Sequence, residues 1–147
     1  IELGRHILEN TSYVIKVIGA PNDFDHCEHI TQKIQSSRVE NLAGKLSLLE
    51  SAHLIQCSRR AFVNDSAPLH LASAAGTATT ALFCSTVPEF GYGPLSSDSV
   101  LIQLEPRLEC MPCGLHGKKQ CPLEHFKCGH DLEVSRVTVE PHLYQTQ

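Results

Sequence analysis

The sequence has no tryptophan, and aromatic residues make up only 5% of its 147 residues. Its basic residues are scattered, with two short pairs at Arg59-Arg60 and Lys118-Lys119 and no basic stripe, and the formal net charge is −4. Proteins that bind nucleic acid usually carry a basic face, often with aromatic side chains on which bases stack. We therefore expect no nucleic-acid partner, and we interpret both basic pairs as solvated surface charges.

Long apolar runs are also missing. The longest are the length of a β-strand, far short of the roughly 20 residues that a membrane-spanning helix needs. The sequence begins with Ile1 and shows no secretion signal, so we expect a cytoplasmic protein and interpret the chain as a piece of a longer one. A chain of 147 residues is long enough for one α/β domain with a core, and we expect residues 1–147 to form that single domain.

Cysteine is abundant by comparison, with seven residues, an odd number that leaves at least one thiol unpaired. Four cysteines fall in an irregular segment, the Cys-rich loop (residues 105–129): Cys110, Cys113, Cys121 and Cys128. They suit a structural zinc site, with histidines as substitute ligands, namely His116, His125 and His130. The second pair is spaced more widely than in a tight zinc knuckle. Two disulfides, or free thiols packed as small apolar groups, are the alternatives.

Apolar segments alternate with segments of helical periodicity along most of the chain. Strands are predicted at 13–18, 39–42, 61–63, 79–83 and 100–104, and helices at the N-terminus, 24–36, 48–55 and 66–75. Ser47 and Glu50 have the spacing of a capping box, Gly76 marks a helix end, and Asn22 or Asp23 is placed to cap the second helix. A further helix after Asp131, broken near Pro141, competes with a strand there.

Strands separated by helices of this length indicate βαβ crossovers and a parallel sheet. The prediction is a Rossmann-like α/β domain with about five strands and helices on both faces. Ligands of such sheets bind beyond the carboxyl ends of the strands.

The segment from Phe62 to His70 follows one such strand end into a helix. The amides of Ser66 and Ala67 at the helix N-terminus suit a diphosphate, and Asp65 suits the hydroxyl groups of a sugar. His70 would lie one helical turn further, near the same ligand. A simpler alternative makes Asp65 and Ser66 an ordinary helix cap.

Residues 64–83, NDSAPLHLASAAGTATTALF, resemble the D-[ST]-G-x-x-H-L-x-A-A signature of glycosyltransferase family 9, the heptosyltransferases. Residues 41–48 (NLAGKLSL), 19–21 (GAP), 85–88 (STVP) and the Cys-x-x-Cys region resemble other segments of that family, in its order. Ala67, Ala20 and Cys84 stand where the family usually has glycine. The likeness runs from about residue 13 to residue 137.

The resemblance implies a GT-B enzyme of two Rossmann-like domains, of which this chain matches the C-terminal, donor-binding one. It implies inverting transfer of heptose from ADP-heptose to the lipopolysaccharide inner core, with no metal needed for the chemistry. The lipid-linked acceptor and the catalytic base would belong to the N-terminal domain, so the chain alone would be inactive and the whole protein peripheral to the inner membrane. The implied donor contacts are Asp65 with the sugar, the Ser66 and Ala67 amides with the diphosphate, and His70 beside it. Leu46 would line the adenine pocket, Asp23 would hold the ribose, and Leu69 is also counted among the donor-binding residues.

Two other functions remain open from the sequence. One is a stand-alone module that binds a nucleotide sugar without transferring it. The other is a zinc-stabilised interaction domain in which the motif around Asp65 is only a helix cap. Binding of ADP would separate the second from the enzyme domain.

Overall fold

The computed structural model describes residues 1–138, and the predicted break near Pro141 lies outside them. The chain divides into two compact units, one of residues 1–51 with the segment from Val137 and one of residues 52–136. None of the helices formed by residues 1–138 has the length and apolar character needed to cross a membrane.

The first unit contains a pair of parallel strands with helices packed beside it. Its elements are α1 (Glu2–Asn10), β1 (Ile15–Val17), the 3-10 turn η1 (Pro21–Asp23), α2 (Phe24–Ile34), β2 (Val39–Asn41) and the start of α3 (Leu48–Gln56). Leu8, Ile34 and Val39 form its buried core, because the apolar positions of α1 and α2 recur at helical spacing and face the strands. The guanidinium of Arg38 donates to the carbonyls of Leu8 and Thr11, which holds the end of α1 beside β2.

The predicted capping box at the start of α3 is confirmed. The Ser47 N–H donates to the Glu50 carboxylate over 2.7 Å, and the Glu50 N–H donates to Ser47 Oγ over 3.3 Å. These bonds hold the pKa of Glu50 below its ordinary value. The helix then presents Leu48 and Leu49 to solvent, with 65% and 82% of their surface exposed.

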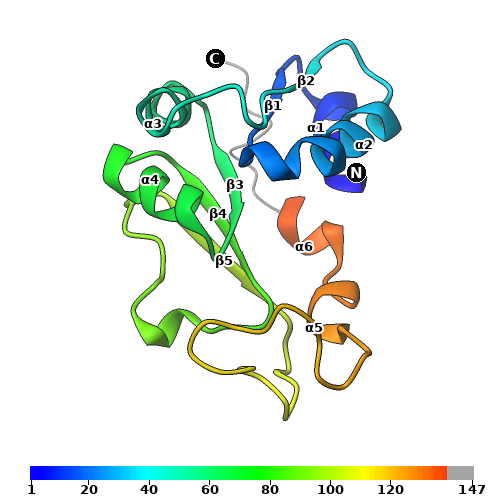
Figure 1. Ribbon diagram of the computed structural model, residues 1–147, viewed down its shortest axis with the longest axis vertical. Helices are drawn as coiled ribbons and strands as arrows, with labels where there is room; N and C mark the ends of the chain where they lie inside the picture. Colours follow the sequence, from blue (N-terminus) through cyan, green and yellow to red (C-terminus); the bar gives the residue numbers. More distant parts are fainter. Residues whose placement is uncertain (139–147) are drawn as a thin grey trace. The chain divides into compact units, whose positions relative to one another are not determined.

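The second unit is built on three parallel strands in the order β3–β4–β5. Its elements are the rest of α3, β3 (Ala61–Asn64), α4 (Ala67–Ala75), β4 (Thr79–Phe83), the 3-10 turn η2 (Pro88–Phe90), β5 (Ser99–Gln103), α5 (Lys127–His130) and the first part of α6 (Val134–Thr138). Helix α4 lies against the sheet, and its Leu69 packs with Ala81 and Phe83 in a fully buried cluster (Figure 1). Gly76 ends α4 in the left-handed conformation, with φ 66°, as predicted.

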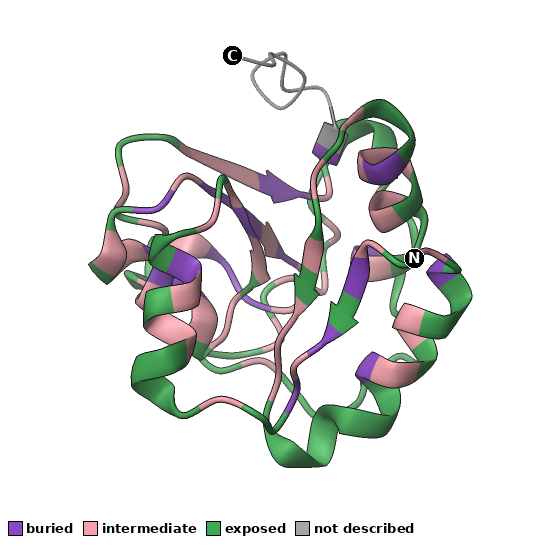
Figure 2. Cartoon of the chain, turned by 90° about the horizontal axis from the view of Figure 1, so that it is seen from above, coloured by how far each residue is buried: buried purple, intermediate pink, exposed green. Residues whose placement is uncertain are grey.

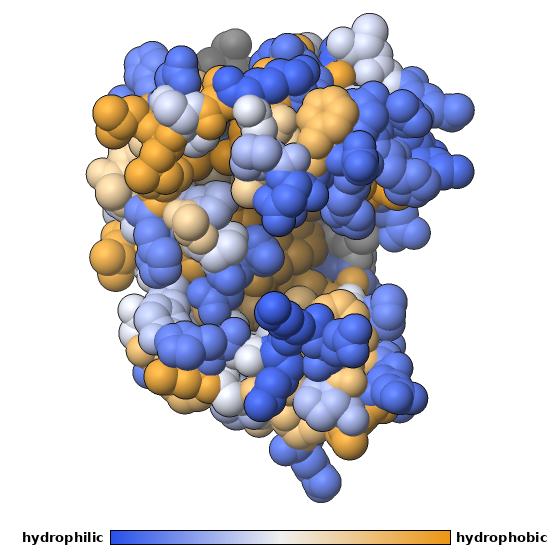
Figure 3. All heavy atoms as spheres, in the orientation of Figure 1, coloured by the Kyte–Doolittle hydropathy of each residue, from blue (hydrophilic) through white to orange (hydrophobic). Residues whose placement is uncertain are grey.

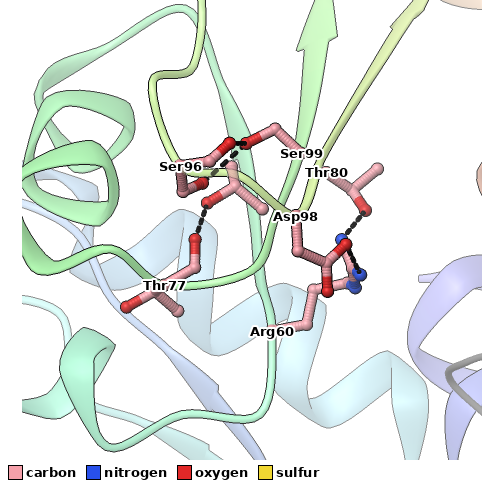
Figure 4. Close-up of polar contacts among 7 residues, drawn as sticks. Arg60, Thr77, Thr80, Ser96, Asp98 and Ser99 are labelled. Atoms are coloured by element: carbon pink, nitrogen blue, oxygen red, sulfur yellow. Dashed lines mark hydrogen bonds and ion pairs between the residues drawn. The ribbon is translucent and has the colours of Figure 1, made fainter.

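The amino ends of the three strands are joined by side-chain contacts (Figure 4). Arg60, just before β3, donates to the Asp98 carboxylate over 2.8 Å and to Thr80 Oγ1 over 3.5 Å. Ser96 and Ser99 hydrogen-bond to each other at the start of β5. Because these groups are already paired with one another, this edge of the sheet is structural, and the opposite edge is where a ligand site is expected.

Residues 1–138 form five strands, all paired in parallel, which confirms the α/β class and the parallel pairing. They are hydrogen-bonded in two groups, β1–β2 and β3–β4–β5, and not in one ladder of five. In Figure 2 many of the buried residues of each unit lie on its strands and helices, as amphipathic elements around a sheet require, and others lie on the loops that follow the strands. The segment after Asp131 forms helix α6 as far as Thr138, so the helical alternative is the one observed there.

Candidate functional site

A pocket of about 660 Å³ opens in the second unit at the carboxyl ends of β3 and β4. This strand-end pocket has three walls: Asn64 and Asp65 after β3, residues 84–86 after β4, and side chains of the Cys-rich loop. The loop contributes His116, Lys118, Lys119, Gln120, Cys121, Glu124 and Phe126. Its volume is in the usual range for sites that bind small molecules or cofactors. The position is the one where parallel α/β sheets bind their ligands.

Asp65 is fixed in this pocket by Thr86. The buried Thr86 hydroxyl donates to Asp65 Oδ2 over 2.6 Å, a length typical of a charge-assisted bond. Within residues 1–138 no protein donor to Asp65 Oδ1 is found, so the second carboxylate oxygen is available to a ligand hydroxyl. This hydrogen bond connects the end of β3 with the end of β4, which are separated in sequence by α4 and β4 itself. Thr86 was not among the site residues predicted from the sequence.

The alternative that Ser66 is an ordinary side-chain cap is not what the structure shows. Ser66 occupies the N-cap position of α4, but its side chain makes no cap bond to the helix. Its hydroxyl donates instead to Asn64 Oδ1 over 2.8 Å. The amides of Ser66 and Ala67 therefore remain available to an anion, whereas Pro68 has no N–H and the Leu69 N–H donates to the Ser66 carbonyl over 3.0 Å. Ala67 is the first residue of the helix and has no positive φ, which explains how alanine replaces the usual glycine here.

The structure separates the two remaining residues of the motif. The side chain of Leu69 is fully buried against the sheet, where it holds α4 in place, and the predicted contact of Leu69 with the donor stays a prediction. His70 is exposed and does not line the strand-end pocket. Its ring centroid lies 6.4 Å from that of Tyr92, which in turn lies 6.2 Å from that of His116 in the pocket wall. A row of rings thus connects α4 with the Cys-rich loop.

The other two predicted donor contacts, Leu46 and Asp23, belong to the first unit. Asp23 is at the N-cap position of α2 but makes no side-chain cap bond, and its carboxylate accepts the Ala20 N–H over 2.9 Å. It thereby closes the turn after β1 and remains exposed. Leu46 is half-buried in the segment that leads into α3. Their roles toward a nucleotide stay predictions.

The zinc site predicted at Cys110, Cys113, Cys121 and Cys128 is not supported. In the part of the chain that the structure describes, no group of three or more His, Cys, Asp or Glu side chains is arranged to hold a metal ion. All seven cysteines are free thiols, so the disulfide alternative is not observed either. Cys128 is buried on α5, which raises its pKa, whereas Cys121 Sγ accepts the Phe126 N–H and has a lowered pKa. After burial, the neighbouring thiols of Cys84, Cys113, Cys110 and Cys121 also raise the pKa of Cys128, so these sulfurs lie near one another without forming a metal-holding group within residues 1–138.

Backbone contacts hold the Cys-rich loop to the end of β4. The Cys113 N–H donates to the Ser85 carbonyl over 2.7 Å. Gly117 has φ +70°, a conformation that favours glycine, and a Cβ built on it would lie 2.6 Å from Ser85 Oγ, so any other residue would be strained and would displace the Ser85 side chain. The loop that the sequence predicts to be ordered by zinc is anchored by these contacts, and they make it a wall of the pocket.

Hydrophilic side chains gather over the segment between β5 and α5 in Figure 3. Two of its cations, Lys118 and Lys119, line the pocket and are exposed. The sequence indicated only a solvated pair, because nothing in its spacing shows that the loop folds back over β3 and β4. The one signal in the sequence for this position of the lysines is Gly117, which directly precedes them in the loop after the last strand.

The comparisons with known proteins agree with the resemblance seen in the sequence. Residues 2–127 match the family model of glycosyltransferase family 9 (heptosyltransferase). The lipooligosaccharide heptosyltransferase 2 of Campylobacter jejuni is 31% identical over 132 residues, which are 88% of this chain and 40% of that protein. The enzyme of the same name from Haemophilus influenzae is 32% identical over 101 residues, covering 67% of this chain and 29% of the relative.

Solved structures similar to the chain include the following two. The ADP-heptose lps heptosyltransferase II of E. coli matches with a TM-score of 0.66 and 26% identity, over 72% of this chain and 32% of that one. The family 9 glycosyl transferase of Veillonella parvula, at 22% identity and a TM-score of 0.64, supports the fold. The chain thus spans less than half the length of the relatives it matches.

Proposed function

Because the chain belongs to glycosyltransferase family 9, the heptosyltransferases, we propose that it is the nucleotide-sugar-binding domain of an inverting heptosyltransferase. The donor we propose is ADP-heptose and the acceptor the lipid-linked inner core of lipopolysaccharide, in keeping with the names of its relatives. The observation that supports the proposal most is the pairing of Asp65 with Thr86 in a pocket that adjoins the uncapped start of α4.

In this reaction an acceptor hydroxyl attacks the anomeric carbon of the heptose while the bond from that carbon to the diphosphate oxygen breaks. Negative charge then accumulates on the leaving diphosphate. The amides of Ser66 and Ala67, together with the positive end of the α4 dipole, stabilise this charge without having to reorganise. Asp65, whose one oxygen is held by Thr86, accepts a hydrogen bond from a sugar hydroxyl with the other.

The base that takes the proton from the acceptor, and the acceptor site, are assigned to a further domain of the complete enzyme. The purified chain is then expected to bind donor but to transfer no sugar. The complete enzyme is expected in the cytoplasm, at the inner face of the membrane where its acceptor is embedded. His70, on the outer side of α4, is assigned to the rim of the donor site.

Calorimetric titration of the chain with ADP, ADP-heptose, GDP-mannose and UDP-glucose tests this function. The proposal predicts that both adenine nucleotides bind and that the GDP and UDP sugars bind more weakly. A chain that binds none of the four contradicts it. A stand-alone binding module has no separate structural support, and the zinc-stabilised interaction domain has lost the metal site on which it depended.

A further inference from the structure

The Cys-rich loop brings two cations into the strand-end pocket, and the donor contacts described above make no use of them. Lys118 and Lys119 both line the pocket, next to each other in sequence and on the same wall as His116. Across residues 1–138 neither ammonium group takes part in an ion pair, although Arg60, Lys16 and Arg107 do. Two neighbouring cations with no carboxylate partner repel each other, and a bound anion removes that repulsion.

The carboxylates of the same pocket do not neutralise this charge. Asp65 is engaged by the Thr86 hydroxyl, and no contact of either acidic side chain, Asp65 or Glu124, with the two lysines is found in the described part of the chain. His116 adds a third nitrogen group to the loop wall and is held by its ring contact with Tyr92. The loop wall of the pocket is therefore cationic, whereas the wall formed by β3 carries the hydroxyl-binding carboxylate.

The backbone on both sides of the lysine pair is anchored. Gly117, directly before it, packs against Ser85, and Cys113 is hydrogen-bonded to the same residue. On the other side, Cys121 Sγ accepts the Phe126 N–H over 3.4 Å. The lysines are thus presented from a short, fixed stretch, which lowers the entropy cost of bringing two flexible side chains to one ligand.

We propose that Lys118 and Lys119 bind a phosphate-bearing group in the strand-end pocket, and that this group is the diphosphate of the nucleotide donor. The inference rests on the proposed function, because it adds a second, side-chain half to the diphosphate site formed by the start of α4. A diphosphate carries charge on both phosphoryl groups, which two adjacent ammonium groups match better than one. The Cys-rich loop then serves donor binding, and its cysteines pack the segment that carries the lysines.

The test compares the double variant Lys118→Gln/Lys119→Gln with a matched control, Lys33→Gln/Lys127→Gln, in calorimetric titrations of the whole chain. Lys33 on α2 and Lys127 on α5 are exposed and do not line the pocket, so the control loses the same charge elsewhere. The probes are ADP, inorganic pyrophosphate, adenosine and a hexose monophosphate. Thermal unfolding of both variants should match the parent chain, because all four side chains are exposed.

We expect the pocket variant to bind ADP and pyrophosphate about tenfold more weakly for each lysine removed, a typical loss for a charge-assisted contact. Adenosine binding and the control variant should be unchanged, and added salt should weaken ADP binding of the parent chain more than that of the pocket variant. Equal losses in both variants, or none in the pocket variant, would overturn the inference while leaving the proposed function intact.

The remaining outcomes separate the two proposals further. Lysine-dependent binding of pyrophosphate with no binding of ADP would retain a phosphate site and refute the nucleotide-binding function. A hexose monophosphate whose binding depends on the lysines, while ADP binding does not, would assign the group to a phosphorylated acceptor sugar and refute the donor assignment. A parent chain that binds none of these probes refutes both.

Discussion

Replacing Thr86 with valine removes one hydroxyl group from the site and keeps the shape of the side chain. That hydroxyl donates to Asp65 Oδ2 over 2.6 Å. Because Thr86 is only 5% exposed, no water molecule can take the place of the lost hydroxyl in the valine variant. A hydrogen bond to a charged group contributes about 1.5–3 kcal/mol when both partners are buried. Asp65 is only half-buried, so in the variant water compensates its carboxylate for part of the lost hydrogen bond. We therefore expect the free energy of unfolding to fall by about 1 kcal/mol.

For a domain of this size such a loss lowers the melting temperature by about 2–4 °C, which calorimetry resolves. The affinity for the nucleotide sugar should fall further than the affinity for ADP, because the loosened Asp65 contacts only the sugar in this account. Thr86→Ser keeps the donor and should restore both quantities almost fully. If Thr86→Val and Thr86→Ser behave alike, the hydroxyl does not position Asp65 and the reasoning is wrong.

Two further predictions concern the Cys-rich loop. Gly117→Ala should detach it, because the added methyl group meets Ser85 and the positive φ is unfavourable for alanine; limited proteolysis within residues 105–126 should become several-fold faster, and an unchanged rate would contradict the anchoring. Cys121, with its lowered pKa, should react with iodoacetamide at lower pH than Cys84 and Cys128, whose pKa values burial raises. Mass spectrometry of labelled peptides gives the order, and first labelling at Cys128 would be incompatible with it.

Most of the fold followed from local sequence patterns. The strand at 79–83 and the capping box of Ser47 with Glu50 depend on residues close together in the chain, and both formed as predicted. The division of the strands into two hydrogen-bonded groups did not follow, because pairing between distant segments leaves no trace in the periodicity of either one. The packing of Leu69 did not follow for a related reason: the motif shows which residues are its neighbours in the chain, but not that its side chain packs against Ala81 and Phe83 of the sheet.

Only the part of the site whose residues are neighbours in the sequence could be predicted. Asp65 and the start of α4 come from one short segment, whereas Thr86, Tyr92 and Lys118 reach the region only through the fold. The zinc prediction is not supported, because the thiols near Cys128 are not arranged as a metal site within residues 1–138, and cysteine spacing in the sequence does not determine that arrangement. What orders the loop is its contact with Ser85, which no cysteine motif encodes.

The central claim is that Asp65 reads the sugar of a nucleotide whose diphosphate rests on α4, and the variant Asp65→Ala tests it most directly. The measurement is the change in affinity for ADP-heptose divided by the change for ADP, in the complete enzyme, with Asp65→Asn as the control that keeps shape and one acceptor. The account predicts nearly unchanged ADP binding and a loss of about 1–3 kcal/mol for ADP-heptose, the value of a buried hydroxyl that loses its acceptor. A ratio near one would contradict it, because both ligands would then respond to the same general change in the site.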